Sequence, residues 1–280
     1  MNSNHMHQQK KLWFEHKKLE SEMINKEWLY FSSEIEKIAT NYGELWENFL
    51  RTPIIQHTMY VCSFDDVFFK KLQFLKQFFS LEIAKEPLVG NPVVQEGFSH
   101  NTIHHLYHIS QYMKAFSANH FKSVENYVEW GGGFGNFARL TKLINPQATY
   151  TIIDLPIMNI LQYRYLSSVL GEDSVNILER NQTPATGKVN LVPSTYYETN
   201  NINADFFVST WALSETPVSV QEKVNQLNWF GAKQGLFAMH SLSPPETFGL
   251  ESTNLRSLLQ KQNYSTQSIQ LMNNQVYMFK

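Results

Sequence analysis

The pattern of apolar positions changes its period near residue 120. Before that point, apolar side chains recur every three or four residues, which is the spacing of one face of an α-helix. This pattern predicts one or two helices over 12–49, a helix over 65–84 and a further helix over 101–116. The helix over 65–84 carries extra phenylalanines outside its main stripe. It therefore packs on two sides, contacts a second copy of the chain in a homodimer, or forms a wall of the substrate site.

After residue 122, short apolar runs alternate with helical stretches. Expected strands lie at 126–130, 149–153, 189–192, 205–209 and 235–239, and expected helices at 137–144, 157–170, 218–229 and 253–262. Alternation of this kind indicates a mostly parallel sheet covered by helices on both faces. Two further strands, 265–271 and 275–279, flank a turn at Asn273-Asn274 and predict an antiparallel hairpin at one edge. We expect a helical region over 1–118 that contributes to the substrate site, and an α/β domain over 119–280.

The composition excludes several classes of protein. The 280 residues carry 23 Lys and Arg against 25 Asp and Glu, so nucleic acid is not expected as a partner. Cys62 is the only cysteine, which excludes a disulfide framework and a thiolate zinc site. No apolar run approaches the roughly 18 residues of a membrane-spanning helix, and the start of the chain shows no secretory signal. We expect a cytoplasmic protein without stable membrane insertion.

Glycine is sparse but concentrated at one place. Four of the 12 glycines fall within 131–135, directly after the strand at 126–130. A backbone without side chains lets a ligand approach closely. Asp154 ends the neighbouring strand, where its carboxylate can accept hydrogen bonds from both hydroxyls of a ribose. Ligands of parallel sheets bind beyond the carboxyl ends of the strands, where the strand order reverses, so the two features together predict a nucleoside site.

Two classes of cofactor use a glycine loop followed by such an acid. A loop that binds a nicotinamide dinucleotide requires the motif GxGxxG or GxGxxA. If the motif begins at Gly131, its last position is Asn136 and it is not satisfied. If it begins at Gly133, its last position is Ala138 and it is satisfied. The loop that binds S-adenosylmethionine is expected to consist of an acid, any residue and then glycines at alternate positions, and residues 129–135 match this pattern at every position. The closing hairpin also favours a methyltransferase. An NAD(P)-dependent oxidoreductase, and a nucleoside-binding protein without catalysis, stay open as alternatives.

Residues 120–280 resemble the class I S-adenosylmethionine-dependent methyltransferases, whose fold is a Rossmann-like sheet with an antiparallel C-terminal hairpin. More narrowly, the chain from about residue 87 onward is similar to the sugar O-methyltransferases of bacterial surface-polysaccharide clusters. The segments that carry this second resemblance are Val89-Gly90-Asn91-Pro92 with Gly97 and Ser99, 129–135, Ile153-Asp154-Leu155-Pro156, Leu161-Gln162 with Tyr165-Leu166, and Ser209 with Leu213 and Glu215. The resemblance implies S-adenosylmethionine as cofactor and a sugar or glycan precursor as acceptor, methylated on a hydroxyl group during polysaccharide biosynthesis.

The strand ends supply the candidate cofactor-binding residues. These are Glu129, Gly131, Gly132, Gly133, Asp154, Leu155, Ser194 and Ser209. Glu129 is expected to orient the methionyl amino group or the loop itself. Asp205 begins its strand and therefore lies at the wrong end of the sheet for this site.

Methylation of a hydroxyl requires a base that removes its proton. His240, after the fifth strand, and Glu215, after the fourth, are the two candidates, and Glu215 could alternatively accept a hydrogen bond from a sugar hydroxyl. Trp211 could stack on a sugar ring, close over the methionyl arm or belong to the core. The helix over 101–116 adds three candidate substrate residues: His104, Tyr107 and His108. His104 and His108 share a helix face at a spacing that can also chelate a metal, but no metal site is expected, since no carboxylate or thiolate lies nearby in the sequence.

Overall fold

The computed structural model describes residues 11, 12, 14, 24–60, 66–241, 252–269, 272 and 274–280. Four expectations involve residues outside this set: most of the first helix before residue 24, the start of the helix over 65–84, the end of the strand over 265–271, and Asn273 of the closing turn. The helices of the N-terminal part are α2 (Lys26–Ala39), α3 (Glu44–Glu47), η1 (Phe49–Arg51), α4 (Pro53–Met59), α5 (Asp66–Leu75), η2 (Leu81–Ala84), α6 (His100–Ala115) and α7 (Ala118–Lys122). A short hairpin of β1 (Val94–Gln95) and β2 (Phe98–Ser99) precedes α6.

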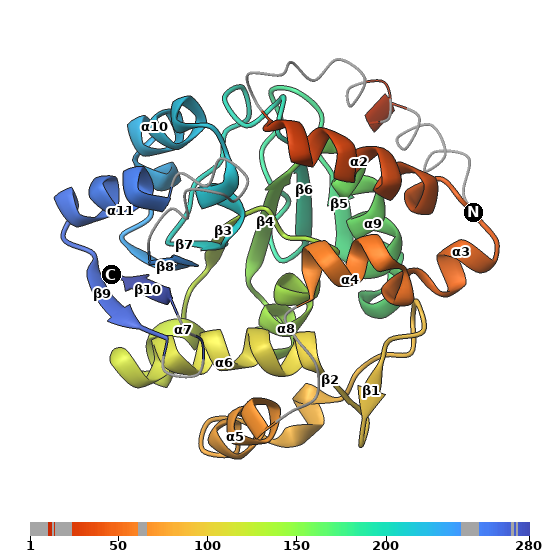
Figure 1. Ribbon diagram of the computed structural model, residues 1–280. Coiled ribbons are helices and arrows are strands. Elements are labelled where there is room, and N and C mark those ends of the chain that lie inside the picture. The colour runs from red at the N-terminus through yellow and green to blue at the C-terminus, as the bar shows by residue number, and fades with distance from the viewer. Residues whose placement is uncertain are drawn as a thin grey trace.

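An eight-stranded sheet forms the centre of the molecule (Figure 1). Its strands are β3 (Asn126–Trp130), β4 (Thr149–Asp154), β5 (Val175–Ile177), β6 (Val189–Pro193), β7 (Phe206–Thr210), β8 (Gln234–His240), β9 (Ser265–Ser268) and β10 (Gln275–Phe279). They lie in the order β5-β6-β4-β3-β7-β8-β10-β9. Every pairing among β3 to β8 is parallel. β10 pairs antiparallel with both β8 and β9. The expected fold class, a Rossmann-like α/β sheet with an antiparallel C-terminal hairpin, is confirmed.

The chain reverses its direction of progress across the sheet between β3 and β7. From β3 it builds one side of the sheet with β4, β5 and β6, and then it returns to the other side of β3 to form β7 and β8. The register pairs Trp130 with Ile153 and Asp154 with Pro193, so the carboxyl ends of these strands meet at one edge. A crevice at such a reversal is the usual ligand site of a parallel sheet.

Alternate residues of the strands pack on opposite faces, as the pleat requires. On β3, Tyr127 belongs to a core formed with α6, α8 (Asn136–Ile144) and α9 (Pro156–Leu170), whereas Val128 and Trp130 belong to a second core with α10 (Val218–Gln226) and α11 (Ser252–Lys261). α5 lies outside α6 (Figure 1). The remaining short helical turns are η3 (Glu172–Ser174), η4 (Ala212–Glu215) and η5 (Asn228–Gly231).

Some elements differ from the sequence-based expectation. The helix over 65–84 is shorter than expected, because α5 ends at Leu75 and only the 3-10 turn η2 follows at Leu81–Ala84. Pro53 begins α4, because the first position of a helix needs no amide hydrogen. The short edge strand β5 was not predicted, and β9 ends at Ser268 rather than at 271.

Candidate functional site

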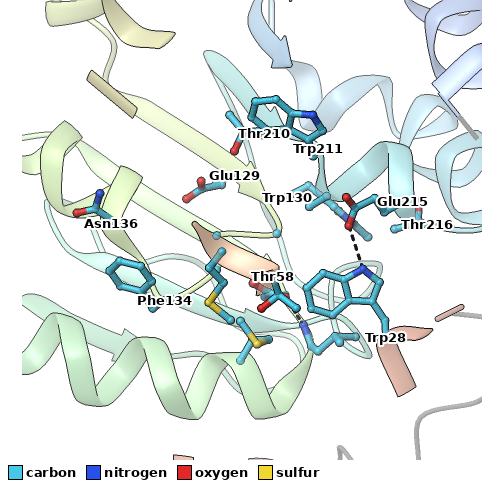
Figure 2. Close-up of a pocket in the computed structure, with 18 of the residues that line it drawn as sticks. Trp28, Thr58, Glu129, Trp130, Phe134, Asn136, Thr210, Trp211, Glu215 and Thr216 are labelled. Atoms are coloured by element: carbon cyan, nitrogen blue, oxygen red, sulfur yellow. Dashed lines mark hydrogen bonds between the residues drawn. The ribbon is translucent and has the colours of Figure 1, made fainter. Parts of the chain in front are cut away.

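A cavity of about 490 Å³ lies at the carboxyl edge of the sheet, beside the reversal of strand order. Its wall comes from the carboxyl ends of β3, β4, β7 and β8 and from the loops that follow β3, β4, β6 and β7. The start of α2 and the end of α4 cover it, through Trp28 and through residues 57–60. Figure 2 shows Glu129, Trp211, Glu215 and Trp28 arranged around this space. Segments distant in sequence therefore complete one pocket.

The glycine loop after β3 passes between tightly packed neighbours. A Cβ on Gly131 would lie 2.0 Å from Ala212 Cβ, and one on Gly132 would lie 2.7 Å from Ile152 Cγ2. Gly133 has φ +56° and would meet only Met59 atoms at 3.7 Å. The first two glycines are therefore required by packing, and Gly133 leaves the loop open on the cavity side.

Gln162 on α9 joins the glycine loop to Asp154. Its Nε2 donates to Gly133 O at 2.8 Å and to Asp154 Oδ2 at 2.7 Å. The amide is held in this orientation by Asn159, whose Nδ2 donates to Gln162 Oε1 at 2.9 Å. Asp154 Oδ1 accepts from the Leu155 amide at 2.8 Å. The glycine loop and Asp154, which the sequence singled out for a nucleoside, are thus bound to one side chain, and Asp154 lines the cavity.

Burial raises the pKa values of the two acids beside the loop. The pKa of Glu129 is raised to about 8, opposed by a hydrogen bond from the Tyr150 hydroxyl at 3.0 Å. The pKa of Asp154 is raised to about 7, opposed by hydrogen bonds from Leu155, Gln162 and the loop amides. Desolvation penalises the charged carboxylates, so a cation or a hydrogen-bond donor in the cavity would stabilise them.

Glu215 lies at the end of η4 and is held by the start of α2. Trp28 Nε1 donates to Glu215 Oε2 at 2.9 Å, and Asn25 Nδ2 donates to the main-chain oxygen of Glu215 at 2.8 Å. Asn25 is also the N-cap of α2, with its side chain accepting from the Trp28 amide. Burial raises the pKa of Glu215, and the indole hydrogen bond opposes that shift. The result is a carboxylate of increased basicity on the cavity wall.

His240, Gln275 and Trp211 form a second hydrogen-bonded group on the wall. Gln275 Nε2 lies 2.7 Å from His240 Nδ1, and Gln275 Oε1 accepts from Trp211 Nε1 at 2.8 Å. Trp211 has φ +64°, an unfavourable conformation for a bulky residue that is often found at functional sites. Its indole stacks on the His104 ring, with the centroids 5.5 Å apart. Trp211 is therefore held from both sides, with one face toward α6.

α6 presents His104 and His105 to the cavity, but not Tyr107 or His108. Both nitrogens of His104 are engaged: Nδ1 lies 2.9 Å from Lys71 Nζ, and Nε2 lies 2.9 Å from His108 Nε2. His108 is fully buried and continues the chain to the Tyr277 hydroxyl at 2.5 Å. Burial is the largest cause that lowers the pKa values of both histidines, so they are neutral at ordinary pH.

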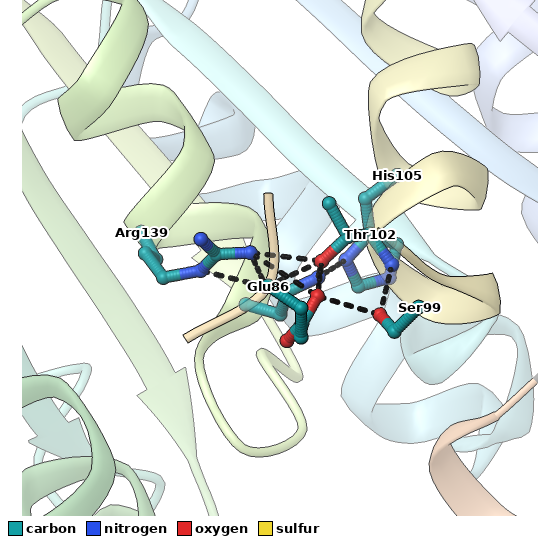
Figure 3. A network of polar contacts seen from close by, with 6 residues as sticks. Glu86, Ser99, Thr102, His105 and Arg139 are labelled. Carbon is teal, nitrogen blue, oxygen red and sulfur yellow. Dashed lines mark hydrogen bonds and ion pairs between the residues drawn. The ribbon is translucent and has the colours of Figure 1, made fainter. Parts of the chain in front are cut away.

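A buried network anchors the N-terminal part of the chain against α8 (Figure 3). Arg139 Nη2 lies 3.7 Å from Glu86 Oε2, and both side chains are almost fully buried. Ser99 and Thr102 donate their hydroxyls to Glu86, while Arg139 donates to Thr102 Oγ1 at 2.8 Å. The network supports α6 at the point where that helix faces the cavity.

The cavity brings together most of the residues that the sequence predicted. They are Glu129, Gly131, Gly132, Gly133, Asp154, Leu155, Ser194, Trp211, His104, Glu215 and His240. Ser209 is not among the lining residues; its hydroxyl donates to Trp130 O and accepts from the Leu213 amide, so it fixes the turn after β7. Asp205 lies at the opposite end of the sheet, as expected, and caps Asn126.

Several residues of the site were not predicted, among them Trp28, His105, Asn136, Gln162 and Gln275. Gln162 belongs to a segment that carries the resemblance, and His105 neighbours a predicted residue, so both gave a signal. Trp28 and Gln275 gave none, because only the folded chain places α2 and β10 at this edge.

The charged lining residues are all acidic. Among the described residues that line the cavity, Glu129, Asp154 and Glu215 are the ionisable acids, and no lysine or arginine occurs. The same described part of the chain holds no group of three or more His, Cys, Asp and Glu side chains suited to a metal ion. Nor does it contain a helix with the length and apolarity needed to cross a membrane.

No family model and no curated protein matches the chain. Among solved structures, mitomycin 7-O-methyltransferase is 12% identical over 63% of this chain and 56% of its own, with a TM-score of 0.44. Magnesium protoporphyrin IX methyltransferase from Synechocystis PCC 6803, solved with S-adenosylmethionine, is 11% identical over 78% of this chain and 98% of its own, with a TM-score of 0.44. Human N-acetylserotonin methyltransferase, also in complex with this cofactor, is 13% identical over 90% and 65%, with a TM-score of 0.42. The chain thus spans less than two thirds of the length of the first and third of these proteins.

Proposed function

We propose that the chain is an S-adenosylmethionine-dependent O-methyltransferase whose acceptor is an uncharged, polyhydroxylated molecule, a sugar or glycan precursor. The observation that carries this proposal is the bridge from the glycine loop to Asp154 through Gln162, at the reversal of strand order. That arrangement offers bare backbone and a ribose-binding carboxylate at one edge of one cavity.

The residues present fit S-adenosylmethionine. Asp154 would accept hydrogen bonds from the ribose hydroxyls, and Gly131, Gly132 and Gly133 would lie along the methionyl arm. Glu129 would accept from the amino group, whose positive charge offsets the desolvation that raises the pKa of this acid. A cavity whose charged groups are carboxylates favours a cationic donor and disfavours the pyrophosphate of a dinucleotide. This charge distribution argues against the NAD(P) alternative.

When bound, S-adenosylmethionine supplies an electrophilic methyl group. The chain's own task is then to align the acceptor hydroxyl, exclude water and take its proton. Glu215 suits the role of proton acceptor, because it lines the cavity and the hydrogen bond from Trp28 to one of its oxygens holds the carboxylate in place. Its raised pKa makes it a stronger base than an exposed glutamate.

The acceptor side of the cavity matches a neutral sugar better than a phosphorylated one. Trp211 presents an aromatic ring that can pack against the apolar face of a sugar. No described lining residue is a cation that would pair with a phosphate or carboxylate. The helical region before residue 118 would complete the acceptor site through Trp28 and α6.

Transfer of a labelled methyl group tests the proposal. The purified chain is incubated with S-adenosylmethionine labelled on the methyl group and, separately, with methyl glycosides and with the matching sugar phosphates. We expect label in a neutral glycoside and less in its phosphate. Transfer to phosphates alone would contradict the acceptor class, and absence of both transfer and S-adenosylhomocysteine binding would contradict the activity.

A further inference from the structure

Two histidines of the cavity are each held by an amide whose orientation is fixed. At His240, the amide is that of Gln275, and its oxygen accepts from Trp211 Nε1 at 2.8 Å. An indole nitrogen can only donate, so this contact identifies the oxygen of Gln275. The other end of the amide, at 2.7 Å from His240 Nδ1, is therefore the NH₂ group. His240 Nδ1 must accept that hydrogen bond.

The same arrangement occurs at His105 with different residues. Asn136 Oδ1 accepts from Arg139 Nε at 3.0 Å and from Arg139 Nη2 at 2.8 Å. A guanidinium also only donates, so Asn136 turns its NH₂ group toward His105 Nδ1, at 3.2 Å. His105 Nδ1 is thus an acceptor as well.

An imidazole that accepts at Nδ1 carries its single proton on Nε2. Protonation of Nδ1 would bring two hydrogens face to face, so each amide also opposes the charged form. Burial lowers the pKa of His240, and burial together with the nearby Arg139 lowers the pKa of His105 to about 3. Both rings line the cavity, and within the described part of the chain neither Nε2 makes a hydrogen bond. His104 differs, because both of its nitrogens are already engaged.

We propose that His105 and His240 each donate an Nε2–H hydrogen bond to an oxygen of the acceptor, and that neither takes the proton of the methylated hydroxyl. This inference rests on the proposed function and reassigns His240 from base to binding residue. It also narrows the substrate class. The acceptor must offer two hydrogen-bond-accepting oxygens besides the reacting hydroxyl, as a sugar or another polyol does and a simple phenol does not.

The tautomers can be measured without any substrate. Nitrogen-15 spectra of the protein labelled on its histidine rings report which ring nitrogen carries the proton, and the His105→Gln and His240→Gln variants assign the two signals. We expect both rings to be neutral at pH 7, with the proton on Nε2. A proton on Nδ1 of either ring, or a charged ring, would overturn the proposal.

Reversing the direction of the hydrogen bond between Gln275 and His240 gives an independent test. Gln275→Glu offers Trp211 an acceptor as before but replaces the NH₂ group with a second acceptor. We expect the proton of His240 to appear on Nδ1, while the His105 signal stays unchanged and serves as the internal control. A His240 ring that still carries its only proton on Nε2 in this variant would show that the Gln275 amide does not determine the tautomer.

The role in binding is tested by methyl transfer to a methyl glycoside. His240→Gln keeps an N–H donor, so we expect less than about threefold change in KM, whereas His240→Leu should raise KM about tenfold, the effect of one neutral hydrogen bond. The pH dependence of kcat should be the same in both. A general base would instead show a loss of about 10²–10⁴-fold in kcat in both variants. Failure of the proposed function would show as no transfer by the wild type, with the tautomers unaffected.

Discussion

Trp28 Nε1 donates a hydrogen bond to Glu215 Oε2 at 2.9 Å, across 187 positions of sequence. The contact brings the first turn of α2 to the turn after β7 (Figure 2). It links the helical region directly to the site, and it partly offsets the burial that raises the pKa of Glu215. The N-terminal part of the chain therefore controls the basicity of a residue at the sheet edge.

Removal of this hydrogen bond should shift the pH dependence of activity. In Trp28→Phe the carboxylate loses a donor, so the pKa of Glu215 rises further. A base works above its pKa, and the acid limb of the kcat profile should therefore move to higher pH. Tyr30→Phe, at an exposed position on the same helix, is the control and should leave the profile unchanged. A limb that moves to lower pH in Trp28→Phe would contradict the assignment.

Glu215→Gln should abolish most of the turnover while leaving the cofactor bound. Loss of a general base costs about 10²–10⁴-fold in kcat, and the amide keeps the size of the side chain. The affinity for S-adenosylhomocysteine, measured by calorimetry, should change little. Glu222→Gln, an exposed position on α10, is the matched control. A loss of less than tenfold in Glu215→Gln would show that the proton leaves by another route.

Cofactor binding should release protons near neutral pH. The pKa of Glu129 in the free protein is raised to about 8 by burial, so this acid is mostly protonated at pH 7. Contact with an ammonium group favours the carboxylate, so the proton leaves and affinity increases as the pH rises from 6 toward 8. Calorimetric titration of S-adenosylhomocysteine in two buffers of different ionisation enthalpy measures the number released. Glu129→Gln should release fewer protons; an equal number would exclude this role.

The buried pair of Glu86 and Arg139 should matter for stability. Removal of one partner leaves an uncompensated buried charge, which typically costs about 3–5 kcal/mol. Arg139→Met should therefore lower the free energy of unfolding in urea by that order. Glu82→Gln breaks an ion pair with Lys85 whose side chains are 75% and 61% exposed, and should cost less than about 1 kcal/mol. Equal effects of the two variants would contradict the account of the network.

The features that the sequence predicted correctly are encoded locally. Four glycines in five positions and an acid at the next strand end are visible without a fold, and the strand pattern places both at one edge. The alternation of strands and helices likewise predicted the sheet. The strands of a parallel sheet are covered by helices on both faces, so they appear in the sequence as short, continuous apolar runs.

Side-chain partnerships between distant segments could not be predicted. The spacing of His104 and His108 pointed to a shared face toward the substrate, but the position of α6 against the sheet buries His108 and turns His105 to the cavity. The partner of His240 depends on the register of β10 against β8, which pairs Gln275 with His240. Helix orientation and strand register are tertiary properties, and periodicity along one chain does not determine them.

Whether the glycine loop and Asp154 hold an adenosyl cofactor can be measured by titration calorimetry with S-adenosylhomocysteine and with NAD. The proteins compared are the wild type, Asp154→Ala and the control Asp205→Ala. We expect the wild type to bind S-adenosylhomocysteine and not NAD. Asp154→Ala should lose about 1.5–3 kcal/mol per charge-assisted hydrogen bond, and Asp205→Ala should bind as the wild type does. Binding of NAD in preference, or unchanged affinity in Asp154→Ala, would contradict this role of the loop and Asp154.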